Sequence, residues 1–170
     1  MNKRILVLVA LLCCLGMGKA AAQMKVAYVN SDSILNALPE TPQKRAELEA
    51  YAKAWQTTID EKRADLEKKI KEIQDGQSTL PPVILQQKAK DAEELRNSLL
   101  QEEQTAQSDV SRKENELLGP LVQKIRDGID KIAKENGYAY VLPANILLYA
   151  DEEHDLTNRV IISLGGTVKQ

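Results

Sequence analysis

The stretch Asp75-Gly76-Gln77-Ser78-Thr79-Leu80-Pro81-Pro82 is the single tip-like break in a highly charged, nearly glycine-free sequence that runs from residue 40 to residue 136. A glycine followed by two prolines is typical of one helix ending and another beginning. A chain that runs out as a helix, turns once and returns forms an antiparallel helical hairpin. The sequence therefore predicts a long arm whose two ends return to the same place.

The first helix of the hairpin is predicted from Glu40 to Gly76, a length of about 55 Å at the rise of an α-helix. Thr41-Pro42 suits its start, since the hydroxyl can accept an unpaired N–H and proline fits the first helical position. Apolar residues recur every three or four positions, as in a coiled-coil seam, but Lys62 falls where an apolar residue is due. The seam residues are Leu48, Ala52, Trp55, Ile59, Leu66, Ile70 and Ile73.

The return helix is predicted to start at Pro82, and its seam is thinner. Glu103 and Lys113 occupy seam positions, and three of the seam residues are alanines that make shallow contacts. Two interpretations remain open. Either the two helices of the arm pack only loosely and the arm can bend, or the helices are offset in register so that the charged and alanine seam positions are better buried. The seam residues are Leu85, Ala89, Ala92, Leu95 or Leu99, Ala106, Val110, Leu117 and Leu121.

Gly119-Pro120 is predicted to interrupt and kink the return helix, because proline lacks the N–H that the helix needs. The position matches the point where the arm meets the rest of the chain. Helix is expected to resume to Asn136 and to end at a C-cap formed by Gly137.

Short apolar segments on both sides of the arm predict a small body that contains β-strands. Strands are expected at 25–30, 138–142 and 146–149, with a short helix after Ser31 or Asp32. A final helix is expected after Asp155 or Thr157, ended by Gly165-Gly166. The fold class is thus mostly α with a small β part: an arm at 40–118 on a body formed by 23–39 and 119–170. With no Phe and one Trp, the core is small, and oligomerisation is a common remedy.

The first 22 residues have the pattern of a signal peptide: a basic start, an apolar run from 5 to 15 and small residues at Ala20 and Ala22. The apolar run is too short to span a bilayer. We expect it to be removed, together with both cysteines, to give an exported chain. Removal leaves 20 basic and 25 acidic residues, a formal charge of −5, which does not favour nucleic acid or anionic membrane as partners.

The sequence predicts no enzyme, no catalytic residue, no cofactor and no metal site. His154 is the one histidine, and a glycine-rich phosphate loop is missing. The acidic run 151–155 around His154 lacks the ligand spacing of a calcium loop, so an exposed turn is favoured over a weak cation site. The basic residues between Lys62 and Lys71 alternate with acids, which favours a surface of ion pairs over a patch for an anionic partner.

Apolar residues that lie off the seam are candidates for contact with another molecule. Scattered exposed apolar groups can hold an unfolded chain without one tight pocket, and a protein that prefers the unfolded state acts as a holdase by mass action. The candidates for contact with such a client are Tyr51, Leu80, Val83, Leu100 and Leu118.

Several short motifs occur in a fixed order outside the arm. They are Lys25-Val26-Ala27-Tyr28-Val29-Asn30 with Ile34-Leu35 and Pro39-Glu40, the junction at Pro120, Lys134-Glu135-Asn136-Gly137-Tyr138, and Leu148-Tyr149-Ala150-Asp151 followed by Asp155-Leu156-Thr157. In this order they resemble the OmpH-like family of periplasmic chaperones, over essentially the whole exported chain. None of these motifs would be specific alone.

The resemblance implies a homotrimer in the periplasm, with strands of three subunits in one β body and three arms around a cavity. It implies an ATP-independent holdase for unfolded outer-membrane proteins. A structural or adaptor coiled-coil protein of the cell envelope, docking one folded partner, is the alternative. The best-known family member is strongly basic whereas this chain is acidic, which puts association with membrane lipid in doubt. By the same analogy the trimer contacts are Val26, Tyr28, Val29, Tyr140, Leu142, Leu147 and Tyr149.

Overall fold

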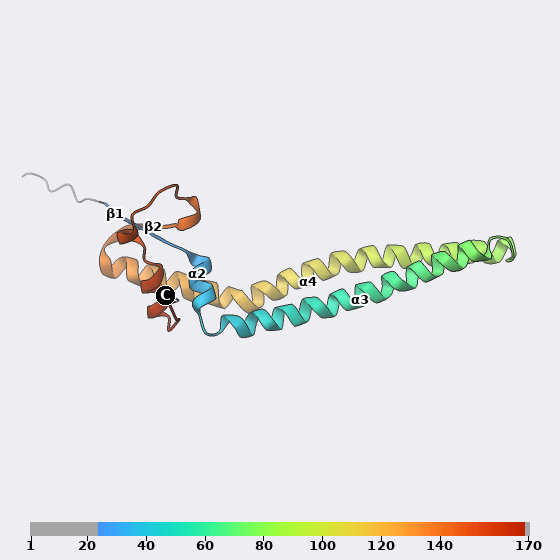
Figure 1. Cartoon of the computed structure of the whole chain (residues 1–170), viewed down its shortest axis with the longest axis horizontal. Coiled ribbons are helices and arrows are strands. Elements are labelled where there is room, and N and C mark those ends of the chain that lie inside the picture. Colours follow the sequence, from blue (N-terminus) through green and yellow to red (C-terminus); the bar gives the residue numbers. More distant parts are fainter. Residues whose placement is uncertain (1–23, 169–170) are drawn as a thin grey trace, which may run out of the picture.

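The computed structural model describes residues 24–168 as a small body from which one long helical hairpin projects (Figure 1). The predicted signal peptide lies outside the described residues. The body contains strand β1 (Lys25–Val29), helix α2 (Ser31–Ala37), strand β2 (Tyr138–Pro143) and helix α5 (Thr157–Ser163), with short 3₁₀ turns at Ala144–Ile146 and Glu152–His154. None of the helices within the described residues has the length and apolar character needed to cross a membrane.

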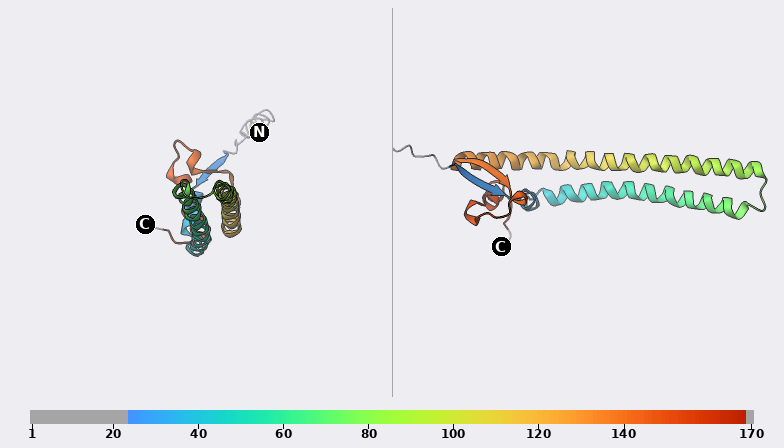
Figure 2. Two further views of the ribbon diagram at one scale, coloured as in Figure 1. Left: turned by 90° about the vertical axis from the view of Figure 1, so that its right-hand side faces the viewer. Right: turned by 90° about the horizontal axis from the view of Figure 1, so that it is seen from above.

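The predicted hairpin is confirmed. Helix α3 spans Thr41–Gly76 and helix α4 spans Pro82–Asn136, and the two run side by side along the arm in the right view of Figure 2. At the tip, Leu80 folds back over Gly76, where a Cβ atom would lie 2.5 Å from the Leu80 Cδ1 atom. The absence of a side chain at Gly76 therefore lets the connection close tightly.

Helix α4 runs through Pro120 without a break, so the predicted interruption at Gly119-Pro120 is wrong. A proline removes a single N–H from the ladder, and Pro120 is exposed, so its ring faces solvent. Leu117 and Leu121, on either side, are buried and hold the helix against its neighbours. The predicted end is confirmed, since Gly137 has φ 69° and its N–H donates to the carbonyl oxygens of Ala133 and Lys134.

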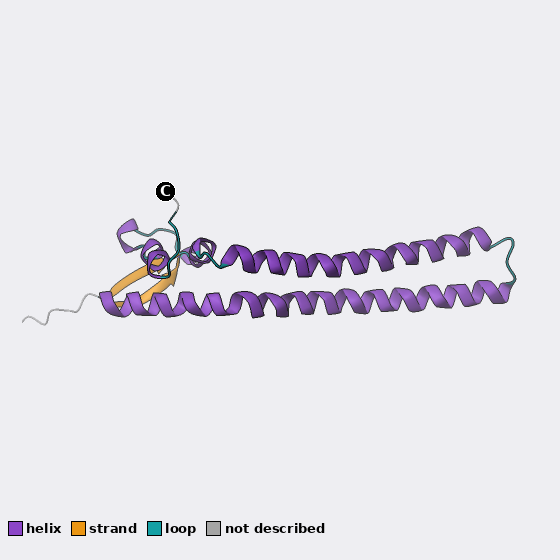
Figure 3. Cartoon of the chain, turned by 90° about the horizontal axis from the view of Figure 1, so that it is seen from below, coloured by secondary structure: helices purple, strands orange, loops and turns teal. Residues whose placement is uncertain are grey.

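The two strands form a parallel pair in which Val26 lies opposite Tyr140 and Tyr28 opposite Leu142. Parallel neighbours need a long crossover connection, and here that connection contains α2 and the whole arm. The strands lie against the body end of α4 (Figure 3). Pairing of β1 with β2 therefore brings both ends of the arm back to one place.

Two predicted helix starts differ in detail. Asn30, rather than Ser31 or Asp32, caps α2, because its Oδ1 atom accepts a hydrogen bond from the Ser33 N–H at 3.0 Å. The Thr41 hydroxyl does not accept an N–H of α3 but donates to the Leu35 carbonyl oxygen, which ties the start of the arm to α2. For α5, the predicted Asp155 does accept the Thr157 N–H, at 2.8 Å.

The strand predicted at 146–149 is not formed. The segment consists of the end of a 3₁₀ turn at Ile146 and irregular chain through Tyr149. Within the described residues β1 pairs with β2 and, at Tyr28, bridges Asp155, so the segment 146–149 joins neither strand.

The core of the body collects side chains from both ends of the chain. Its most deeply buried members are Ile34 in α2, Val160 in α5, and Leu38 and Leu156, which directly flank these two helices. They pack with buried residues of β1 and of the last part of α4: Ala27, Val29, Leu121, Ile125 and Ile132. One face of α4 beyond Pro120 therefore belongs to the body, whereas its earlier part belongs to the arm.

Replacing Pro120 with alanine is expected to raise the free energy of unfolding by about 1–3 kcal/mol, because it restores a helix donor at an exposed position. Urea unfolding of the variant measures this. Pro42→Ala is the matched control, since proline at the first turn of α3 costs little and its removal is expected to leave stability nearly unchanged. Unchanged or reduced stability of the Pro120 variant would contradict the regular helix described here.

Candidate functional site

Five ion pairs join the two sides of the arm, and together they form a ladder from its root to its tip. From the body end of the arm to its tip, the charged side chains on the α3 side are two acids, two bases and one acid. Each faces a side chain of opposite charge on α4. The pairs are Glu40–Lys124 (2.7 Å), Glu47–Lys113 (3.3 Å), Lys62–Glu102 (2.7 Å), Arg63–Glu103 (2.8 Å) and Glu72–Lys88 (2.7 Å).

The charged residues that interrupt the predicted seam are members of this ladder. Lys62, Glu103 and Lys113 each face an opposite charge on the other helix. The apolar contacts between them are sparse: Ile59 packs with Leu99 and Ala106. Of the two interpretations, the structure favours a register that gives the seam charges partners. It also favours ion pairing for the start of the basic segment, Lys62 and Arg63.

The apolar seam is narrower than predicted. Ile70 is 43 % exposed and Ala89 is exposed, although both were placed in the seam. Near the tip Ile73 and Leu85 are half-buried, and Glu72 pairs with Lys88, so the two helices still meet there.

The ladder shifts the protonation of its members in the direction that favours pairing. A hydrogen bond from Lys124 lowers the pKa of Glu40, and one from Lys88 lowers the pKa of Glu72. Hydrogen bonds to Glu116 and Glu47 raise the pKa of Lys113. These groups are exposed to water, so each pair stabilises the arm only slightly. The contribution of the ladder is therefore mainly to select one register, since a shift by one rung brings like charges together.

The apolar residues that remain exposed on the arm are few and spread along it. Two predicted client contacts are among them, Val83 at 68 % exposure and Leu100 at 50 %. Ile70 and Ile84, each 43 % exposed, were missed, although the position of Ile84 beside Val83 in the uncharged tip was a usable signal.

The other three predicted client contacts are less available. Tyr51 is half-buried, and Leu80 is half-buried where it covers Gly76. Leu118 packs against the core of the body, because the body face of α4 begins one turn before Pro120. Within the single chain, therefore, Val83 and Leu100 are the predicted contacts that face solvent most fully.

A second exposed apolar surface lies on the body, in the uncharged sequence that follows Gly137. Tyr140 is 57 % exposed, Tyr149 85 %, and Leu148 is fully exposed. The loop that carries the last two stands out from the body (Figure 1). Of the other predicted trimer contacts, Val26 is 39 % exposed, Tyr28, Leu142 and Leu147 are half-buried, and Val29 is buried in the chain's own core.

The acidic run near His154 is an exposed turn in which carboxylates accept hydrogen bonds from backbone N–H groups. Asp151 accepts the Glu153 N–H at 3.0 Å, and Asp155 accepts the Thr157 N–H. Burial, followed by the nearby charges of Asp155, Glu152 and Asp151, raises the pKa of Tyr28. Among the described residues no group of three or more His, Cys, Asp or Glu side chains is placed to hold a metal ion.

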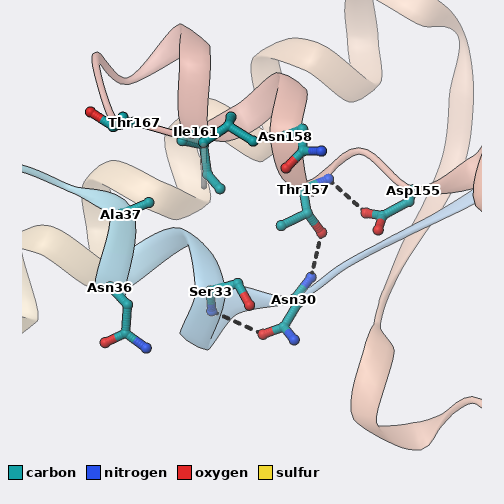
Figure 4. Close-up of a pocket in the computed structure, with 10 residues that line it drawn as sticks. Asn30, Ser33, Asn36, Ala37, Asp155, Thr157, Asn158, Ile161 and Thr167 are labelled. Atoms are coloured by element: carbon teal, nitrogen blue, oxygen red, sulfur yellow. Dashed lines mark hydrogen bonds between the residues drawn. The ribbon is translucent and has the colours of Figure 1, made fainter. Parts of the chain in front are cut away.

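One hollow of about 430 Å³ lies between α2, α5 and the last residues of the chain (Figure 4). Its polar groups bond to one another: the Asn30 N–H donates to the Thr157 hydroxyl at 2.9 Å, and the Asn30 side chain accepts from Ser33. Its lining contains amides, hydroxyls and the Asp155 carboxylate, without a histidine or a cysteine. This arrangement supports the connection between α2 and α5 rather than a reaction.

Comparison with known proteins identifies the family to which this fold belongs. The family model described as "Outer membrane protein (OmpH-like)" matches residues 25–164. The chain belongs to the OmpH-like family. It is 28 % identical over 163 residues to the chaperone protein Skp of Yersinia enterocolitica, and 26 % identical over 157 residues to that of Pectobacterium atrosepticum. Each match covers 88 % of this chain and 95 % of the relative.

An OmpH-like protein of known structure has the same fold. It is a putative outer membrane chaperone from Caulobacter crescentus, 18 % identical, with a TM-score of 0.65 over 85 % of this chain and 86 % of that one. The OmpH-like fold predicted from the order of the motifs is therefore confirmed.

Lys62→Glu or Glu102→Lys alone is expected to destabilise the arm, by about 0.5–1 kcal/mol, because each places like charges together across the helices. The double variant restores the pair with its sign inverted and is expected to recover most of that loss. Urea unfolding of the four proteins gives the coupling energy. Arg112, which pairs with Asp109 on its own helix, provides the control: Arg112→Glu combined with Glu102→Lys is expected to show no recovery. Additive single effects at 62 and 102 would contradict the ladder.

Proposed function

We propose that the chain is an exported, ATP-independent holdase that acts in the periplasm as a homotrimer and binds unfolded outer-membrane proteins. The observation that carries the proposal is the arm, a hairpin on a small body, in a member of the OmpH-like family whose relatives include chaperones named Skp. No nucleotide is required, because binding the unfolded state in preference to the folded one already lowers the concentration of chain that can aggregate.

The arm suits a client that has no fixed shape. Its exposed apolar residues are separated along its length, for example Val83 near the tip and Leu100 further toward the body. Each offers a small apolar area, so each contact is weak and exchanges quickly. Several arms around one client would supply many such contacts at a high local concentration. The proposed role is non-enzymatic and needs neither a cofactor nor a metal.

The body offers a reason for assembly. Within the described residues β2 pairs only with β1, and the other edge of β1 carries only a bridge between Tyr28 and Asp155. A two-stranded sheet is marginal by itself. Tyr140 in β2 and Leu148 and Tyr149 in the segment after it expose apolar surface. We place the trimer contact here, on the predicted residues Val26, Tyr28, Tyr140, Leu142, Leu147 and Tyr149, with Val29 supporting the strand from inside the core.

The acidic charge of the exported chain bears on how clients are captured. With 25 acidic residues against 20 basic ones after removal of the signal peptide, general attraction to nucleic acid or anionic lipid is not favoured. Capture is expected to depend on apolar contact and enclosure, and hence to vary little with salt.

Dilution of a urea-unfolded outer-membrane β-barrel protein into the chain, without nucleotide, is expected to give less light scattering than dilution into buffer. Suppression is expected to saturate near three chains per client. Val83→Ser with Leu100→Ser is expected to weaken suppression at least about threefold, because it removes exposed apolar contacts. Ile162→Ser, at an equally exposed position on the body (67 %), is the control. A folded protein that fails to suppress scattering at any ratio would favour the adaptor alternative.

Tyr149→Asp is expected to convert the trimer into monomers, because it places an unpaired charge in an apolar contact. The residue is 85 % exposed in the single chain, so the variant should keep its fold. Light scattering coupled to size-exclusion chromatography gives the mass, and Ile162→Asp is the matched control that should remain trimeric. A trimeric Tyr149 variant would show that the contact lies elsewhere, and a monomeric unmodified chain would exclude the proposed assembly.

A further inference from the structure

The two helices of the arm are attached to the body in different ways. Helix α4 continues from the tip into the body as one helix, to Asn136. Helix α3 instead begins at Thr41, after a non-helical link of three residues that separates it from α2. The α4 side of the arm is therefore an extension of the body, whereas the α3 side is held only as firmly as α2 is held.

The last described residues of the chain, Leu164–Val168, form a strap over the end of α2. Helix α5 ends in a capping motif in which the Gly165 N–H donates to the Ile162 carbonyl oxygen at 3.1 Å and the Gly166 N–H to that of Ile161 at 2.9 Å. Gly165 has φ +78°, a conformation that glycine adopts without strain. This motif turns the chain back toward α2, which in Figure 4 lies at one end of the polar hollow.

The strap bonds directly to the last residue of α2. The Thr167 N–H donates to the Ala37 carbonyl oxygen at 3.2 Å, so it satisfies an acceptor that the helix end leaves open. Figure 4 shows Thr167 and Ala37 on neighbouring segments beside Ile161. Val168, the next residue, packs against the core.

Close packing leaves no room for a side chain at Gly166. A Cβ atom there would lie 2.8 Å from the Ala37 carbonyl oxygen and 2.9 Å from Ile161 Cγ2. The first of these is a backbone atom, so the contact can be relieved only by moving the end of α2 or the strap. At the other end of the strap, Leu164 seats over Gly128 of α4, where a Cβ atom would lie 3.0 Å from its Cδ2 atom.

We propose that this C-terminal strap is a clamp that fixes the root of α3 and thereby sets the stiffness of the arm. Two helices that lie side by side can bend together only if one of them slides along the other. The fixed α4 and the clamped α2 prevent that sliding at the root. Release of the strap frees the end of α2, and α3 then moves along α4 against the weak ion pairs of the ladder.

The polar ties at the link that remain after release are the Thr41 hydroxyl on the Leu35 carbonyl oxygen and the Glu40–Lys124 pair. The first moves with α2, and the second is an exposed pair of low energy. The side chains of Ile34 and Leu38 also stay in the core of the body, so the strap adds a backbone hydrogen bond at the end of α2 to this apolar packing. For a chaperone whose arms hold a client, the strap would set how readily the arms spread, a consequence that rests on the proposed function.

Gly166→Val tests the clamp by hydrogen exchange. Amides of residues 31–48 are expected to exchange about tenfold faster than in the unmodified chain, whereas those of residues 121–136 in α4 keep their rates, because the opening is local. Gly119→Ala is the matched control, since a Cβ atom at Gly119 meets nothing within 4 Å. Unchanged exchange over 31–48 would overturn the proposal, and so would equal acceleration over 121–136, which would make the strap part of the global core.

A second variant keeps the test valid if Gly166→Val does not fold. Removal of residues 167–170 deletes the Thr167 bond and leaves the cap of α5 intact, and it is expected to give the same local acceleration of hydrogen exchange.

Spin labels at Ala54→Cys and Ser108→Cys, in a chain that starts at residue 23 and so has no other cysteine, report sliding of α3 along α4. Their distance distribution is expected to broaden on removal of the strap. A distribution of unchanged width would contradict the clamp, whatever the outcome of the client-binding experiment.

Discussion

The antiparallel pairing of α3 with α4 is the interaction on which the structure depends, and it is achieved with little apolar contact. Along the arm, Ile59, Leu99 and Ala106 form a small buried cluster, and alanines occupy other seam positions. Apolar packing of this kind tolerates slippage, since one alanine contact resembles another. The ladder of opposite charges reduces that tolerance, because a shift by one rung brings like charges together at some of the rungs. Weak interactions thus define a register even where none of them contributes much stability.

The body holds both ends of this arm with few residues. The parallel pairing of β1 and β2 closes the chain around the arm, and α4 serves as arm helix and body helix in succession. α2, α5 and the residues that directly flank them supply the most deeply buried side chains. What remains is a core too small to cover the strand edges and the tyrosines beside them, and that uncovered surface is the physical basis of the proposed assembly.

Function follows from what the fold leaves exposed. Part of the arm's charge is paired across its two helices, and Val83 and Leu100 remain exposed. Such a surface suits weak contact with an unfolded apolar chain, in keeping with the OmpH-like family to which this protein belongs.

The sequence by itself determined the features that depend on neighbours along the chain. Gly76 with Pro81-Pro82 defined the tip, and Gly137 and Gly165 defined helix ends, because proline and glycine restrict or extend backbone geometry wherever they occur. The fold class and the family followed from these signals and from the order of the motifs. The exposure of Val83 was also predictable, because Val83 lies off the apolar seam.

The tertiary structure decided everything that depends on a partner distant in sequence. Lys62 and Lys113 looked like defects of the seam until the register placed Glu102 and Glu47 opposite them. Pro120 looked like a break, yet packing of Leu117 and Leu121 keeps the helix continuous. The run from Ile146 to Tyr149 had the composition of a strand but pairs with neither β1 nor β2. Gly166 looked like a simple stop, and only its approach to Ala37 shows that the segment after α5 reaches the end of α2. Local signals fix backbone geometry, whereas register, strand pairing and close approach are set by which surfaces meet, and that information is shared between segments far apart in the chain.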